Sequence, residues 1–212
     1  MTSNDWAVWV VAMLKGGTRK TTTTMELAFG LARRDRAVLV IDADYRSQGV
    51  TDWGSKVYAA GGELPFDVSQ WTPALGLLVP FVQQQAKKLR PSHVLVDVGG
   101  EDPEAISQLI MIAKRVISPV GPEEAETSRL PATRMLIEPS GVPMSVLLTR
   151  VPSPGKGLAA AARRGIVKGG LHVLATEIEH NRDRYANIWG TVPEDIGAYD
   201  ALTDELLTGK AA

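Results

Sequence analysis

Residues 13–22, Met13-Leu14-Lys15-Gly16-Gly17-Thr18-Arg19-Lys20-Thr21-Thr22, decide the fold class of this chain. They follow an apolar run of strand length and precede a helical pattern. Consecutive glycines let backbone N–H groups turn toward an anion, and the N-terminus of the following helix adds partial positive charge. Lys20 can then reach the β- and γ-phosphates of a nucleotide, and the Thr21 hydroxyl can ligate Mg²⁺. The stretch predicts a phosphate-binding loop; the competing interpretation is a Gly-Gly turn flanked by solvated lysines.

Short runs rich in Val, Ile and Leu alternate with stretches of helical length along the chain. Strands are predicted at residues 6–14, 37–41, 93–98, 115–120, 144–149 and 172–178. Helices are predicted at 20–34, 47–60, 74–90, 103–113, 123–138 and 157–167, and Pro80 and Pro131 should end or kink two of them. Continuous apolar runs indicate strands buried on both faces. We therefore expect an α/β fold, a doubly wound, mainly parallel sheet flanked by helices, in a single domain over residues 1–212.

Composition narrows the class of protein. The 212 residues are 44% apolar and 22% charged, as in ordinary globular proteins, and no apolar run approaches the ~18–20 residues that a membrane span needs. The first residues are polar and show no signal-peptide pattern, so we expect a cytoplasmic protein. The chain has no cysteine, which excludes disulfides, iron–sulfur clusters and thiolate zinc sites.

Aspartates follow two of the predicted strands. Asp42 and Asp44 come after the strand at 37–41, and Asp97 ends the run that begins at His93. Ligands of open α/β sheets bind at the carboxyl ends of the strands, so these carboxylates are expected beside the phosphate-binding loop. The alternatives are a solvated turn for Asp42 and Asp44, and a cap of the next helix for Asp97.

Taken together, these stretches resemble one family. Residues 15–22, Lys-Gly-Gly-x-x-Lys-Thr-Thr, look like the deviant Walker A box of the ParA/MinD ATPases, P-loop NTPases whose additional lysine sits where Lys15 does. Residues 38–44, 94–100 and 116–122 are similar to the family's next three boxes. The resemblance is specific in residues 13–53 and 93–122, is loose after residue 150, and is nearest to the short, ParF-like plasmid-partition proteins. We therefore expect no N-terminal helix-turn-helix domain.

The resemblance implies a Mg²⁺-dependent ATPase of DNA partition, with ATP and Mg²⁺ as cofactors. Asp44 would orient the attacking water, Lys20 would contact the phosphates, and Lys15 would reach the partner's phosphates across a dimer interface. The metal site would comprise Thr21, Asp42 and Asp97. The residues expected to bind nucleotide are Lys15, Gly16, Gly17, Thr18, Arg19, Lys20, Thr21 and Thr22.

The resemblance also implies partners. The protein would dimerise on ATP, as a dimer or within a filament, bind DNA without sequence preference on the nucleoid, and respond to a ParB-like centromere-binding protein. Although the net charge is only −1, residues 150–184 hold seven basic side chains against three acidic ones. DNA contacts are therefore expected at Arg150, Lys156, Arg163, Arg164 and Lys168. The alternative for this segment is an ordinary solvated helix face.

Two departures from the family pattern bear on activity. Arg19 replaces the glycine before Lys20, and Tyr45-Arg46 replaces the common Pro-Gln. An arginine adopts φ > 0 only at a cost, and its guanidinium would add charge beside the phosphates, so we expect slow basal hydrolysis. One alternative is a nucleotide-gated switch with little or no turnover. Another is a MinD-like positioning protein at a membrane, but residues 199–207 are acidic and would be repelled by anionic lipid, so no membrane partner is expected.

Overall fold

An entirely parallel, seven-stranded sheet forms the centre of the protein. The computed structural model describes residues 6–153 and 156–209. The strand order is β3-β2-β4-β1-β5-β6-β7, which places the first strand in the middle and confirms the doubly wound α/β prediction. The strands are β1 (Ala7–Val11), β2 (Val38–Asp42), β3 (Asp67–Gln70), β4 (His93–Asp97), β5 (Arg115–Val120), β6 (Met144–Val151) and β7 (His172–Glu179).

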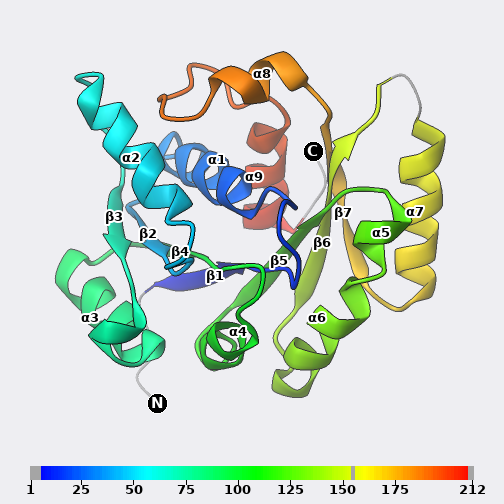
Figure 1. The fold of residues 1–212 in the computed structure, drawn as a ribbon, viewed down its shortest axis with the longest axis horizontal. Coiled ribbons are helices and arrows are strands. Elements are labelled where there is room, and N and C mark those ends of the chain that lie inside the picture. The colour runs from blue at the N-terminus through cyan, green and yellow to red at the C-terminus, as the bar shows by residue number, and fades with distance from the viewer. Residues whose placement is uncertain (1–5, 154–155, 210–212) are drawn as a thin grey trace.

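Helices cover both faces of this sheet (Figure 1). One face carries α1 (Lys20–Ala32), α2 (Gly49–Ala59), α8 (Arg182–Asn187) and α9 (Ala198–Thr208). The other carries α3 (Leu78–Leu89), α4 (Pro103–Leu109), α6 (Leu130–Ile137) and α7 (Lys156–Lys168). The short helix α5 (Glu124–Thr127) and the 3₁₀ turns η1 (Pro73–Leu75) and η2 (Glu138–Ser140) complete the connections.

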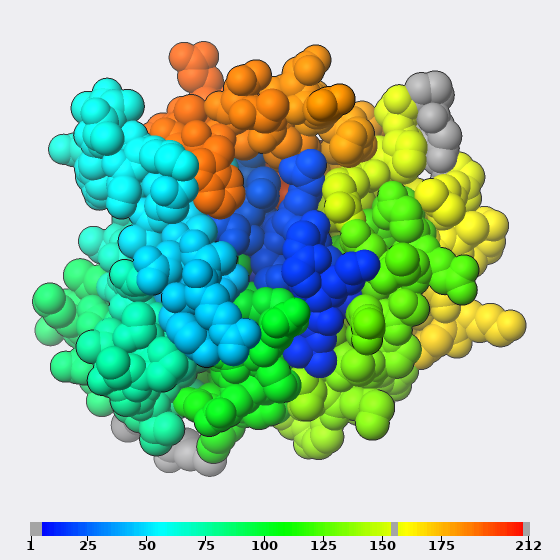
Figure 2. Space-filling view, viewed as in Figure 1, coloured from blue at the N-terminus to red at the C-terminus, as the bar shows by residue number. Residues whose placement is uncertain are grey.

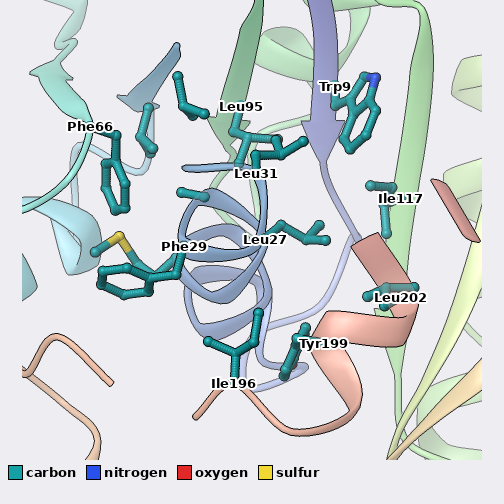
Figure 3. Close-up of a cluster of buried hydrophobic side chains, with 14 of the residues drawn as sticks. Trp9, Leu27, Phe29, Leu31, Phe66, Leu95, Ile117, Ile196, Tyr199 and Leu202 are labelled. Carbon is teal, nitrogen blue, oxygen red and sulfur yellow. The ribbon is translucent and has the colours of Figure 1, made fainter. Parts of the chain in front are cut away.

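The central strands are buried on both faces because successive side chains alternate between two apolar cores. In β1, Trp9 packs into the core beneath α1, α2 and α9, whereas Val8 and Val10 point into the core beneath α3 and α4. Figure 3 shows the first of these cores, with Leu27 and Phe29 leaving opposite sides of α1. The continuous apolar runs of the sequence are thus explained by the two layers of helices.

Two long predicted helices are divided in the structure. The stretch at 74–90 becomes η1 followed by α3, and the stretch at 123–138 becomes α5, α6 and the start of η2. Pro80 and Pro131 do not kink a continuous helix; each lies in the first turn of a new one. A proline is tolerated there because the N–H that it lacks would have no partner within the helix.

The short strand β3 was not predicted. Its four residues, Asp67–Gln70, are mostly polar and half exposed, and they pair with β2 at the edge of the sheet. A strand with one open edge and one solvated face needs no apolar run, so the pattern used for the central strands could not detect it.

The acidic helix α9 is part of the core. Tyr199, Leu202 and Leu206 are buried beside α1 and β7, while Arg34 forms ion pairs with the exposed carboxylates of Asp200 and Asp204. Its apolar face is therefore occupied by the protein's own core. Within residues 6–153 and 156–209, no helix is both long enough and apolar enough to cross a membrane.

Candidate functional site

The phosphate-loop segment, residues 12–19, joins the carboxyl end of β1 to the N-terminus of α1. It lies at the surface in the middle of one face, between the segment after β4 and the segment of α5 (Figure 2). Gly17 has φ +74°, and a Cβ placed on either Gly16 or Gly17 would meet open space. An anion can thus approach the loop backbone and the positive end of α1 together.

Lys20 begins α1, and its side chain folds back over the loop. Its Nζ donates to the carbonyl of Lys15 at 2.9 Å, and the residue is buried. Burial lowers the pKa of this ammonium, whereas the nearby Asp97 and Asp44 raise it. A buried cation that faces an anion-binding loop is suited to a phosphate ligand.

Asp97 ends β4 and faces the first turns of α1. Its two oxygens accept hydrogen bonds from Thr21 Oγ1 at 2.7 Å and Thr24 Oγ1 at 3.2 Å. Burial raises the pKa of Asp97 to about 7, while the hydrogen bond from Thr21 opposes the shift. The next helix is capped by Asp102, whose carboxylate accepts from the Ala105 N–H, so the helix-cap interpretation of Asp97 is wrong.

Asp42 lies beside Asp97 in the register of β2 and β4. It is fully buried, which excludes the solvated-turn interpretation for this residue. Its Oδ2 accepts from the Thr51 N–H at 2.9 Å and the Thr51 hydroxyl at 2.8 Å, an anchor for α2 that was not predicted. Its Oδ1 has no hydrogen-bond partner within the part of the chain that the structure describes, and burial raises the pKa of the Asp42 carboxyl.

Asp44 is partly exposed and lines a cavity of about 230 Å³ together with Gly16, Gly99 and Gly100. Its Oδ1 accepts weakly from the Ser47 N–H at 3.3 Å, which leaves most of its hydrogen-bonding capacity free. The carboxylate and the phosphate loop therefore border the same space, as the position of Asp44 in the sequence predicted.

Gly100 is a site residue that the sequence analysis did not single out. A Cβ at this position would lie 2.7 Å from the carbonyl carbon and oxygen of Lys15 and 2.8 Å from the nitrogen of Gly16. The chain after β4 thus passes directly against the backbone of the phosphate loop. This approach is possible because glycine has no Cβ.

The donor set fits Mg²⁺ bound together with phosphates. Thr21 Oγ1 donates to Asp97, and Asp42 lies beside Asp97 with its buried Oδ1 unpaired among the described residues, so oxygen ligands are gathered at the carboxyl ends of β2 and β4. Across the described parts of the chain, no group of three or more His, Asp or Glu is arranged to hold a metal ion alone. Mg²⁺ commonly uses one or two protein ligands with phosphates and water, which is what these residues offer.

The additional lysine of the motif contacts α5. Lys15 Nζ donates to the Ala125 carbonyl at 2.8 Å. In the adjacent turn Glu126 forms an ion pair with Arg150 and also accepts from the Gly121 N–H at 2.6 Å. The role of Lys15 across a dimer interface stays a prediction.

Arg19 has the left-handed backbone that its position in the motif predicts, with φ +69°. Its side chain takes a direction that was not predicted. The guanidinium carbon lies 4.1 Å from the ring centroid of Tyr185 in α8. The guanidinium thus stacks on an aromatic ring, and its effect on the phosphates stays a prediction.

The predicted DNA-binding cations do not form one free surface. Arg150 turns toward the phosphate loop, where it pairs with Glu126 and donates to the Gly17 carbonyl at 3.4 Å. Arg163 lies against β7 and pairs with Glu177 at 2.8 Å. Arg164 and Lys168 are exposed and have no ion-pair partner among residues 6–153 and 156–209. The side chain of Lys156 lies outside the described residues.

Comparisons with known proteins agree on the kind of domain. A family model described as the CobQ/CobB/MinD/ParA nucleotide binding domain matches residues 9–188. The maintenance of carboxysome distribution protein A of Gloeobacter kilaueensis is 34% identical over 167 residues, which cover 76% of this chain and 72% of that protein.

Two solved structures have the same fold. A plasmid partition protein of Borrelia burgdorferi bound to AMPPNP has a TM-score of 0.76 at 15% identity, covering 97% of this chain and 100% of that one. The septum site-determining protein MinD of Pyrococcus horikoshii with Mg-ADP has a TM-score of 0.69 at 19% identity, covering 97% and 98%. The predicted deviant Walker fold is thereby confirmed.

Proposed function

Because this chain belongs to the CobQ/CobB/MinD/ParA nucleotide-binding domain family, we propose that it is a Mg²⁺-dependent ATPase that dimerises on ATP and positions a large cargo in the cell. One observation carries the proposal. The carboxyl ends of β1, β2 and β4 bring Lys20, Thr21, Asp44 and Asp97 around one phosphate-binding loop. Phosphoryl transfer requires mainly this kind of positioning and charge neutralisation.

Each residue has a defined part in this proposal. The loop backbone and Lys20 would bind the phosphates, and Thr21, Asp42 and Asp97 would hold Mg²⁺ beside them. Mg²⁺, when bound, neutralises charge that develops on the phosphate oxygens. Asp44, with free acceptor capacity beside the loop, orients a water molecule for attack.

The proposal for the cargo follows the relatives. The carboxysome-distribution protein is 34% identical, whereas the plasmid partition protein matches at 15%. We therefore propose a carboxysome-like assembly as the first candidate cargo and a partitioned DNA molecule as the second. The DNA surface, the nucleoid location and a stimulating ParB-like partner remain predictions that apply to both. A membrane-bound variant is disfavoured because the apolar face of α9 is already buried.

A turnover assay with matched variants tests the ATPase. Phosphate release and fluorescent ATP binding are measured with and without Mg²⁺ and DNA. Lys20→Ala should lose binding, whereas Asp44→Asn should bind ATP with turnover lowered by about 10²-fold. Lys114→Ala is the control. Lys114 is exposed just before β5 begins, at the amino ends of the strands, whereas the phosphate loop lies at their carboxyl ends.

The outcomes separate the candidate functions. Mg²⁺-dependent turnover that Asp44→Asn lowers by about 10²-fold supports the ATPase. ATP binding without turnover under every condition supports the nucleotide-gated switch, since Arg19 would then have stopped the cycle. Cargo class is read from imaging a fluorescent fusion in its own cells, where even spacing of an assembly and even spacing of a DNA molecule are distinguishable.

A further inference from the structure

Arg19 combines an unfavourable backbone with an unusual side-chain contact. Its φ of +69° lies in the left-handed region, which a residue other than glycine occupies at a cost. Its Nε is buried and has no hydrogen-bond partner among residues 6–153 and 156–209, so the guanidinium leaves one donor unpaired there as well. The free-energy costs of the left-handed backbone and of the unpaired Nε must both be offset by a favourable contact elsewhere.

The contact is with α8. The Arg19 guanidinium lies over the Tyr185 ring, 4.1 Å from carbon to centroid, a cation–π geometry that strengthens when it is shielded from water. Tyr185 is partly buried and packs against the core that contains α1. The phosphate loop is therefore attached through one side chain to a helix that follows β7, far along the sequence.

A second contact joins α8 to α1, the helix that follows the phosphate loop. Arg184 pairs with the fully buried Glu26 of α1 at 2.8 Å and also lies near the Tyr185 ring, at 5.8 Å. In Figure 1, α8 lies across α1 and α9. Glu26 holds α8 to the middle of α1, whereas Arg19 holds it to the phosphate loop itself. Of these two contacts, only the one between Arg19 and Tyr185 changes directly when the phosphate loop changes shape.

We propose that Arg19 is a positioning residue that couples the phosphate loop to α8 through the Tyr185 ring, so that nucleotide binding and the placement of α8 stabilise each other. This inference rests on the proposed nucleotide-binding function. A ligand that orders the phosphate loop should also order α8. Because coupling is reciprocal, loss of the Tyr185 ring should lower the ligand's affinity by the same free energy that the ligand contributes to the placement of α8.

A double-mutant cycle tests the link, with MgADP as the probe. Tyr185→Leu should lower MgADP affinity about three- to tenfold, the range of one cation–π contact. Tyr185→Phe keeps the ring and should retain the affinity. Arg19→Gly adopts the left-handed backbone freely, so it should bind MgADP while losing the link, and adding Tyr185→Leu to it should change affinity less than about twofold. Tyr58→Leu, at an exposed tyrosine of α2, is the control.

Amide hydrogen exchange supplies a readout independent of affinity. MgADP should increase protection of residues 182–187 in the parent and in Tyr185→Phe, and leave it unchanged in Arg19→Gly. If Tyr185→Leu had equal effects with and without Arg19, or if α8 gained equal protection in Arg19→Gly, the coupling would be disproved while nucleotide binding stood. A parent protein that failed to bind MgADP would overturn both this inference and the proposed function.

Discussion

Substituting Gly100 by alanine tests how closely the chain after β4 supports the phosphate loop. The added Cβ would lie 2.7 Å from the Lys15 carbonyl carbon and oxygen, whereas ordinary contacts begin near 3.4 Å. The overlap is with backbone, so no flexible side chain can move aside. Overpacking of this kind costs about 1–3 kcal/mol.

The free-energy cost of this overlap must appear either in the free energy of unfolding or in the affinity for MgADP. If the loop keeps its shape, the free energy of unfolding falls by about 1–3 kcal/mol, which for a chain of this length lowers Tm by about 2–12 °C. If the loop shifts instead, MgADP affinity falls by about 5- to 150-fold. Urea denaturation and calorimetric titration of the same variant measure both terms.

Gly165→Ala is the matched control. A Cβ at Gly165 would meet nothing within 4 Å, and the residue lies inside α7, so alanine should stabilise the protein by about 0.5–1 kcal/mol. If Gly100→Ala changed both the unfolding free energy and MgADP binding by less than about 0.5 kcal/mol, the proposed support of the loop would be wrong.

Three further predictions concern the dimer, the pH dependence of stability and DNA binding. Lys15→Ala should bind ATP but no longer dimerise with it, and normal ATP-dependent dimers in light scattering would contradict the cross-interface role. Burial raises the pKa of Glu26 from 4.5 to about 7, so the free energy of unfolding should fall as pH rises from 4.5 through 7, and E26Q should flatten this pH dependence in urea unfolding. If DNA binds α7, Arg164→Ala combined with Lys168→Ala should lower affinity equally for unrelated duplexes and reduce the salt slope by about 2, whereas Arg163→Ala should leave the slope unchanged because Glu177 already neutralises it. An unchanged slope in the double variant would place the DNA surface elsewhere.

The sequence was sufficient for the residues that the sheet topology brings together. Lys20, Asp44 and Asp97 each follow an apolar run, and parallel strands necessarily carry such residues to the same edge. The division of the helices at 74–90 and 123–138 was less accessible, because a proline is equally compatible with a kink and with a new first turn.

Side-chain directions that depend on distant partners could not be predicted. Arg150 and Arg163 both belong to the basic segment 150–184, but Glu126 and Glu177 decide where their side chains point. The stacking of Arg19 on Tyr185 likewise joins residues that only the completed fold places in contact. A count of charges in a segment therefore overestimates the charge that the segment presents to a partner.

The central position of β1 has a consequence for synthesis on the ribosome. This strand pairs with β4 and β5, which begin at His93 and Arg115, so β1 is synthesised before both of its neighbours and must wait for them. At ordinary elongation rates the interval from β1 to β4 lasts roughly 4 to 17 s. During that time Asp97 has not been made, so Thr21 lacks its hydrogen-bond acceptor and Lys20 lacks this nearby carboxylate. Nucleotide can therefore stabilise this domain during synthesis only after β4 and Asp97 have left the exit tunnel.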